Sequence, residues 1–97
     1  MNILKWIMDW YNSNCDGDWE HEYGVRIDTL DNPGWSITID LVDTSLHGYE
    51  TEFVRVENSD DDWYDFKFHD NKFTAGGDPT KLELLLTKFK EVVDSHG

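Results

Sequence analysis

The segment from Cys15 to Glu22 holds the densest set of side chains in this chain that could do chemistry. One thiol is followed closely by four carboxylates and an imidazole, which belong to Asp16, Asp18, Glu20, His21 and Glu22. Oxygen and nitrogen donors spaced this closely can bind a metal ion, a thiol can act as a nucleophile, and paired carboxylates can act as general acid and base. The spacing and the surrounding charge test each of these three chemistries.

The spacing of the acids argues against a calcium site. Asp16, Asp18 and Glu20 alternate as the first ligands of a calcium-binding loop do, but that 12-residue pattern also requires glycine in its sixth position and glutamate in its twelfth. His21 and Ile27 stand at those two positions. We therefore predict that this segment binds no metal and that the protein uses no cofactor.

The surroundings of Cys15 disfavour a reactive thiolate. Thiolates are stabilised by positive charge, by a helix N-terminus or by a paired imidazole. Cys15 is instead expected to follow a helix C-terminus, and the acids Asp16 and Asp18 come directly after it. We therefore predict that the protein is not an enzyme. A small enzyme that uses Cys15, or the carboxylates of Glu20 and Glu22, stays open as an alternative.

The net charge narrows the choice of partner. The 97 residues include 21 acids and 8 bases, which gives a formal charge of -13 at pH 7. This charge repels nucleic acid and anionic lipid, and it attracts a basic protein. Toxins that act on nucleic acids are often basic because they must grip phosphate. The alternative is that the charge only keeps the chain soluble.

Two tryptophans and an acidic run complete the candidate binding residues. Trp19 lies between acids in an expected turn, and Trp63 falls on the polar face of its expected strand. An exposed tryptophan ringed by carboxylates is typical of an interface anchor, because it offers a large apolar area at low entropy cost. The candidate partner-binding residues are Asp16, Asp18, Trp19, Glu20, His21, Glu22, Asp60, Asp61, Asp62 and Trp63.

Helical spacing marks both ends of the chain. An apolar stripe at i, i+3, i+4 and i+7 predicts a helix over residues 2–14 with Asn2 as its cap. A second stripe, from Leu82 to Val93, predicts a C-terminal helix that opens at Asp78 and Pro79, with Thr80 and Glu83 as an alternative capping box. The first stripe consists of Ile3, Trp6, Ile7 and Trp10. Lys5 and Asp9 interrupt it, so neither a signal peptide nor a membrane span is expected.

A period of two predicts a sheet between the helices. Strands are expected over residues 21–30, 35–41, 50–57 and 63–69, with a short fifth strand around Phe73. The order helix, antiparallel meander, helix predicts the α+β class. We expect a single domain over the whole chain, 1–97, in which an antiparallel sheet of four to five strands is flanked by an N-terminal and a C-terminal helix.

The register of the first hairpin follows from its apolar residues. Residues directly opposite in an antiparallel pair share a face, and the apolar residues of both strands have odd numbers. A five-residue loop over 30–34 is preferred, because a three-residue loop would put Pro33 at a disfavoured turn position. This register pairs Thr29 with Trp35, Ile27 with Ile37, Val25 with Ile39 and Tyr23 with Leu41.

The run from Cys15 to Trp35 reads CDGDWEHEYGVRIDTLDNPGW and resembles the signature of the immunity protein 53 family. Similar proteins open with a Trp-containing amphipathic helix and continue through a motif like CDGDWEHxYG and a TLDNPGW turn. They end with an aromatic strand, a Phe-Gly-Gly-like segment and a Leu-rich helix. The corresponding segments here are 6–11, 15–24, 29–35, 63–68, 73–77 and 82–89.

The resemblance implies a small bacterial protein that acts in the cytoplasm of the producing cell. Its expected function is to bind and neutralise a cognate polymorphic toxin by stoichiometric occlusion. The expected partner is a toxin domain, with a basic nuclease as one candidate, and neither nucleic acid nor membrane is bound directly. An acidic binding module for another basic protein is the alternative. The resemblance carries no catalytic residue onto this chain.

Overall fold

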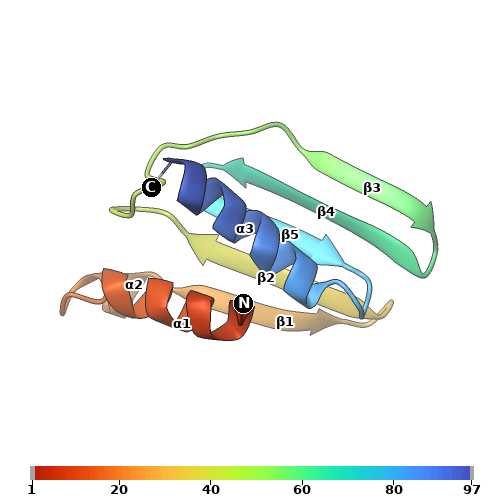
Figure 1. The fold of residues 1–97 in the computed structure, drawn as a ribbon, viewed down its shortest axis with the longest axis horizontal. Coiled ribbons are helices and arrows are strands. Elements are labelled where there is room, and N and C mark those ends of the chain that lie inside the picture. Colours follow the sequence, from red (N-terminus) through yellow and green to blue (C-terminus); the bar gives the residue numbers. More distant parts are fainter. Residues whose placement is uncertain (1, 97) are drawn as a thin grey trace.

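The structure is a computed structural model that describes residues 2–96. It contains one antiparallel sheet, and both longer helices cover the same face of it (Figure 1). The elements are α1 Ile3–Asn14, α2 Trp19–Glu22, β1 Val25–Leu30, β2 Gly34–Asp40, β3 Val54–Ser59, β4 Asp62–His69, β5 Lys72–Gly77 and α3 Leu82–His96. The predicted α+β class, with a sheet flanked by N-terminal and C-terminal helices, is confirmed. Among the described residues, no helix is long and apolar enough to cross a membrane.

The strand order differs from the predicted meander. The strands lie in the order β1-β2-β5-β4-β3, so β2 pairs with β5 and not with the next strand along the chain. The connection over residues 41–53 carries the chain past β5 and β4 to the far edge of the sheet (Figure 1). The meander prediction was wrong because apolar alternation indicates which face a strand buries but not which strand lies beside it.

The first hairpin has the predicted register but a shorter loop. Val25 pairs with Ile39, Ile27 with Ile37 and Thr29 with Trp35. Leu30 also pairs with Gly34, so the loop has three residues, 31–33, and not the five that were expected. The Asn32–Pro33 peptide bond is cis, and tight turns with a cis proline accept it at a position where a trans proline is disfavoured.

The predicted strand over residues 21–30 began four residues too early. Trp19–Glu22 form the short helix α2, and the N–H of Tyr23 closes it by donating to the carbonyl of Trp19 at 2.9 Å. Tyr23 therefore does not pair with Leu41, whose N–H donates to the carbonyl of Asn71 instead. A helix of about one turn is too short for a helical period to show in the sequence.

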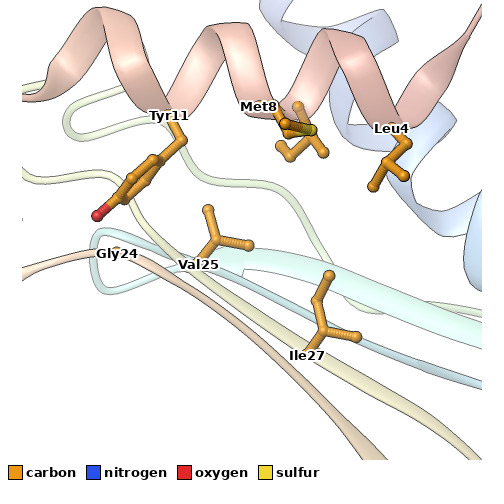
Figure 2. A pocket seen from close by; sticks show the side chains of 7 residues that line it. Leu4, Met8, Tyr11, Gly24, Val25 and Ile27 are labelled. Carbon is orange, nitrogen blue, oxygen red and sulfur yellow. The ribbon is translucent and has the colours of Figure 1, made fainter.

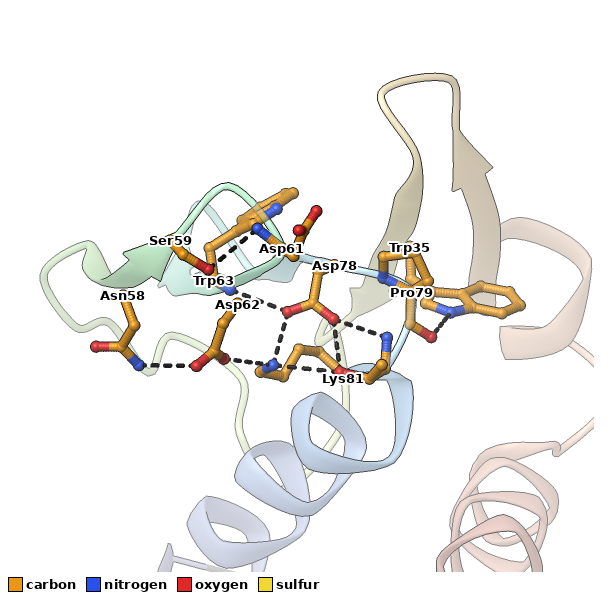
Figure 3. Close-up of polar contacts among 10 residues, drawn as sticks. Trp35, Asn58, Ser59, Asp61, Asp62, Trp63, Asp78, Pro79 and Lys81 are labelled. Carbon is orange, nitrogen blue, oxygen red and sulfur yellow. Dashed lines mark hydrogen bonds and ion pairs between the residues drawn. The ribbon is translucent and has the colours of Figure 1, made fainter.

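Two further boundaries are shifted. β3 begins at Val54 and not near residue 50, and α3 begins at Leu82, one turn after Asp78 and Pro79. Asp78 is buried and accepts hydrogen bonds from Trp63, Thr80 and Lys81, so it ties β4 to the start of α3 (Figure 3). The expected helix opening at Asp78 is therefore replaced by a buried polar cluster.

The core lies between the sheet and the two helices. Ile37 and Ile39 are fully buried, which confirms the predicted facing of β2, whereas Ile27 on the edge strand β1 is 37% exposed. The side chain of Asn2 caps α1 as predicted, accepting from the N–H groups of Leu4 and Lys5. The side chains buried most completely from the strands and α3 are Ile37, Ile39, Phe68, Phe73, Leu85 and Phe89.

Candidate partner-binding surface

The structure divides the ten candidate residues between two ends of the molecule. Asp16, Asp18, Trp19, Glu20, His21 and Glu22 belong to the loop after α1 and to α2, and we call their exposed part the α2 surface. The other four, Asp60, Asp61, Asp62 and Trp63, belong to the turn between β3 and β4 and to the start of β4. These two regions lie at opposite ends of the longest axis of the molecule, which extends over 42 Å (Figure 1). They therefore do not form one continuous patch.

Two carboxylates of the α2 surface hold its own loop in place. One oxygen of Asp16 accepts the N–H groups of Asp18 and Trp19, each at 2.9 Å. Glu20 accepts the N–H groups of Asp16 at 3.0 Å and of Gly17 at 3.0 and 3.1 Å. These backbone donors lower the pKa of both carboxyls, with the N–H of Trp19 first for Asp16 and the N–H of Glu20 itself first for Glu20. Both groups are therefore ionised near neutral pH, which does not suit a general acid.

Trp19 is buried, so the prediction of an exposed anchor at this position was wrong. Its side chain is 4% exposed, and its indole Nε1–H donates to the carbonyl of Val42 at 2.8 Å. Its ring meets the ring of Trp10 edge to face, with centroids 6.2 Å apart. The first turn of α2 points this ring toward the core, whereas the sequence suggested that the preceding turn continued through residue 19.

Acidic side chains from two segments line a polar hollow beside α2. Asp16, Asp18 and Glu22 line it together with His21, and Asp43 joins them from the connection after β2. Within residues 2–96, none of these four carboxylates has a lysine or arginine as an ion-pair partner. No pattern in the sequence indicates that Asp43 belongs here, because only the fold brings it close to the other acids. The hollow concentrates negative charge that the rest of the described chain does not neutralise.

The β3–β4 turn offers less free charge. Asp60 and Asp61 are exposed in the turn, but Asp62 pairs with Lys81 at 2.7 Å (Figure 3). Trp63 is half-buried on the helix-free face, as its place in β4 predicted. The guanidinium of Arg55 lies over its ring, 5.3 Å from the centroid. Arg55 therefore covers part of the aromatic surface that an anchor would offer.

Cys15 is held as a structural thiol. It is half-buried, and its Sγ donates to the carbonyl of Tyr11 at 3.3 Å, the pattern of a polar side chain in the last turn of a helix. The pKa of Tyr11 is raised, first by the negative charge that Cys15 would carry as a thiolate, then by a hydrogen bond with the Cys15 side chain and by burial, and last by the charge of Glu20. Within the described residues, no three His, Cys, Asp or Glu side chains come together to hold a metal ion.

Comparison with known proteins gives one match. The model of the family described as Immunity protein 53 matches residues 4–94. Neither the curated proteins nor the solved structures contain a match. The matched range includes all five strands, the α2 surface and nearly all of both longer helices, leaving out three residues at each end of the chain.

Proposed function

This chain belongs to the immunity protein 53 family, and from that premise we propose that it neutralises a cognate polymorphic toxin by forming a stoichiometric complex that occludes the toxin. The observation that supports a binding role is the hollow beside α2, which is lined by four carboxylates that have no lysine or arginine partner within residues 2–96. Such a surface complements a basic protein and attracts it over long range. The proposed site of action is the cytoplasm of the producing cell, where the toxin would otherwise act on its maker.

The proposed partner is a basic toxin domain, and a nuclease fits this description because it must grip phosphate. The net charge of -13 supports the same direction of attraction. A simple check is the gene neighbourhood. A large secreted protein with a variable C-terminal toxin domain, encoded immediately upstream, would supply the partner for the experiments below.

We expect the double substitution Asp18→Lys and Glu22→Lys to slow association with that toxin domain by about tenfold, because it reverses the field of the α2 surface. Both side chains are exposed and neither holds the loop, so the fold should persist. Surface plasmon resonance at two salt concentrations measures the association rate. The difference between wild type and variant should shrink at high salt, because the screening length there is shorter than the roughly 8 Å of physiological salt.

The matched control is the double substitution Asp60→Lys and Asp61→Lys, which makes the same charge change at the other end of the molecule. Its association rate should change much less, because only nearby charges steer the final approach. If the control slows association and the α2 variant does not, the toxin meets the β3–β4 turn. Equal rates for all three proteins would contradict electrostatic steering altogether.

Cys15→Ser should leave protection against the toxin unchanged. The serine hydroxyl can still donate to the carbonyl of Tyr11, and no step of the proposed function needs a thiol. Survival of cells that carry the toxin, with and without the variant, measures protection. A variant that folds, as judged by circular dichroism, but fails to protect would favour the enzymatic alternative.

A further inference from the structure

The two edges of the sheet differ in how they are protected. β3 has a register shift between Glu57 and Ser59, which hinders pairing with another strand. β1 pairs with β2 without a shift over all of its residues, Val25–Leu30, and contains no proline. A regular edge of this kind is a ready template for a further strand.

The ladder shows which backbone groups of β1 are free. The N–H of Asp40 donates to the carbonyl of Gly24 at 3.1 Å, so these two residues form a hydrogen-bonded pair. Hydrogen-bonded pairs alternate along an antiparallel ladder, so the even-numbered residues of β1 face β2. The N–H and C=O groups of Val25, Ile27 and Thr29 therefore point away from the sheet.

An apolar groove lies beside this edge. We call it the α1/β1 groove; it encloses about 340 Å³ and is lined by Leu4, Ile7, Met8, Tyr11, Gly24, Val25 and Ile27 (Figure 2). Leu4 and Met8 are 60% and 61% exposed, and they sit one turn apart on the side of α1 that overhangs β1 (Figure 2). The groove and the free backbone groups together form a surface that is apolar and able to pair.

We propose that a second copy of this chain pairs with this surface. The β1 strands of the two copies would lie antiparallel about a twofold axis that passes beside Ile27. Each Arg26 then lies opposite Asp28 of the second copy, at the close spacing of a non-hydrogen-bonded pair. Arg26 already donates to Asp40 of its own copy at 3.2 and 3.3 Å, but its side chain is 52% exposed, and a guanidinium has further N–H groups that can donate to a second carboxylate. Opposite charges at such positions stabilise a strand pair, so the edge is complementary to itself.

The charges also select this register. Only residues whose backbone N–H and C=O groups point away from β2 can bond to the second copy, and these residues have odd numbers. The two neighbouring registers that meet this condition have their twofold axis beside Arg26 or beside Asp28. One of them places Arg26 opposite Arg26, and the other places Asp28 opposite Asp28. Like charges directly opposite each other are destabilising. Of these three registers, the one centred on Ile27 avoids both.

The same register covers the α1/β1 groove. Val25 lies opposite Thr29 of the second copy, and Ile27 lies opposite Ile27, all on the face that carries α1. α1 runs antiparallel to β1 and places Leu4 near Ile27 and Tyr11 near Gly24 (Figure 2). The α1 helices of the two copies therefore lie over opposite halves of the paired strands. Ile27 and Thr29 of each copy then lie on the face of the sheet that Leu4 and Met8 of the other copy overhang.

The net charge of each copy opposes this association only weakly at physiological salt, because it is screened over about 8 Å. At the edge itself the guanidinium of Arg26 would lie between Asp40 of its own copy and Asp28 of the second copy, and Lys5 on α1 is paired with Asp9 at 3.0 Å. The association would therefore rest on the backbone pairing and the apolar groove, with the Arg26–Asp28 contact selecting the register. The dimer requires no toxin, so its test is independent of the proposed function.

Sedimentation velocity over a wide range of protein concentration tests the proposal. We expect the wild-type chain to pass from monomer to dimer as its concentration rises. Ile27→Lys should abolish the dimer, since it puts two lysines at the axis. The matched control is Val54→Lys on the opposite edge, where the side chain is 38% exposed, and it should dimerise like wild type.

Two substitutions of Asp28 test the register. Asp28→Arg should raise the dimer dissociation constant by about tenfold or more, because it places like charges opposite each other twice. Glu52→Arg makes the same change of net charge away from the edge and should have little effect. Asp28→Asn should weaken the dimer in the proposed register, whereas it would strengthen a dimer that pairs Asp28 with Asp28. A wild-type chain that stays monomeric, an equal loss in Val54→Lys or Glu52→Arg, or a stronger dimer in Asp28→Asn would overturn the proposal.

Discussion

Asp78→Asn is expected to lower the free energy of unfolding by about 3–5 kcal/mol, the usual cost of removing one partner from a buried ion pair. Asp78 is 1% exposed and pairs with Lys81 at 2.6 Å (Figure 3). Its carboxylate also accepts the N–H of Trp63 at 2.9 Å, and the N–H and hydroxyl of Thr80 at 2.8 and 2.6 Å. A neutral amide has one acceptor oxygen and cannot balance the charge of Lys81. Urea unfolding followed by circular dichroism measures the loss.

The matched control for this prediction is Asp62→Asn. Asp62 pairs with the same lysine at 2.7 Å, but its side chain is 51% exposed. Water can therefore solvate Lys81 in place of the lost carboxylate charge. The loss of stability should therefore be much smaller than for Asp78→Asn. Similar losses for the two variants would show that the burial of Asp78 contributes little.

The carboxylate of Asp78 should also make the stability of the fold depend on pH. Burial by itself would raise the pKa of Asp78, but the hydrogen bonds from Lys81, Thr80 and Trp63 outweigh it and hold the pKa well below its ordinary value of 3.8. A carboxyl with a depressed pKa stabilises the fold fully above its unfolded pKa, and this stability is lost as the pH falls through the folded pKa. Wild type should therefore lose stability below about pH 4, and Asp78→Asn should lose less over the same range.

The periodic patterns of the sequence correctly predicted the helices, the facing of β2 and the register of the first hairpin. The stripe on α1 and the alternation in β1 and β2 follow from the requirement that each element buries one face, and this requirement also set the pairing of Ile27 with Ile37. The pairing of β2 with β5 depends on contacts between residues far apart in the chain. No period within a strand encodes such contacts, so the meander was predicted in its place.

The candidate site was predictable in composition but not in arrangement. The acids of the α2 surface were identified because they are close together in the sequence. Asp43 was missed because it reaches the same hollow only through the fold, and the ion pair of Asp62 was not foreseen because its partner Lys81 lies on a distant segment. The same limit explains Trp19, whose neighbours in sequence are acids while its neighbours in space are aromatic rings.

Trp19→Ala is expected to lower the free energy of unfolding by about 3–5 kcal/mol, because it opens a cavity in the core. The ring contacts the rings of Trp10, Tyr11 and Tyr23, with centroids 5.9 to 6.2 Å away, and the indole N–H bonds to Val42. Trp19→Phe keeps an aromatic ring but loses that hydrogen bond, so its loss should be intermediate. Urea unfolding of the three proteins gives the order.

The effect of Trp19 on toxin binding should be indirect. The ring anchors α2 beneath the acids of the α2 surface, so its removal should disturb their arrangement and slow association with the toxin. The folded fraction of Trp19→Ala should dissociate at a rate close to that of wild type, because a ring that is 4% exposed offers the toxin almost no contact area. Surface plasmon resonance, corrected for the folded fraction, separates the two rates. Wild-type stability combined with much faster dissociation would instead identify Trp19 as an interface anchor, which would require α2 to open when the toxin binds.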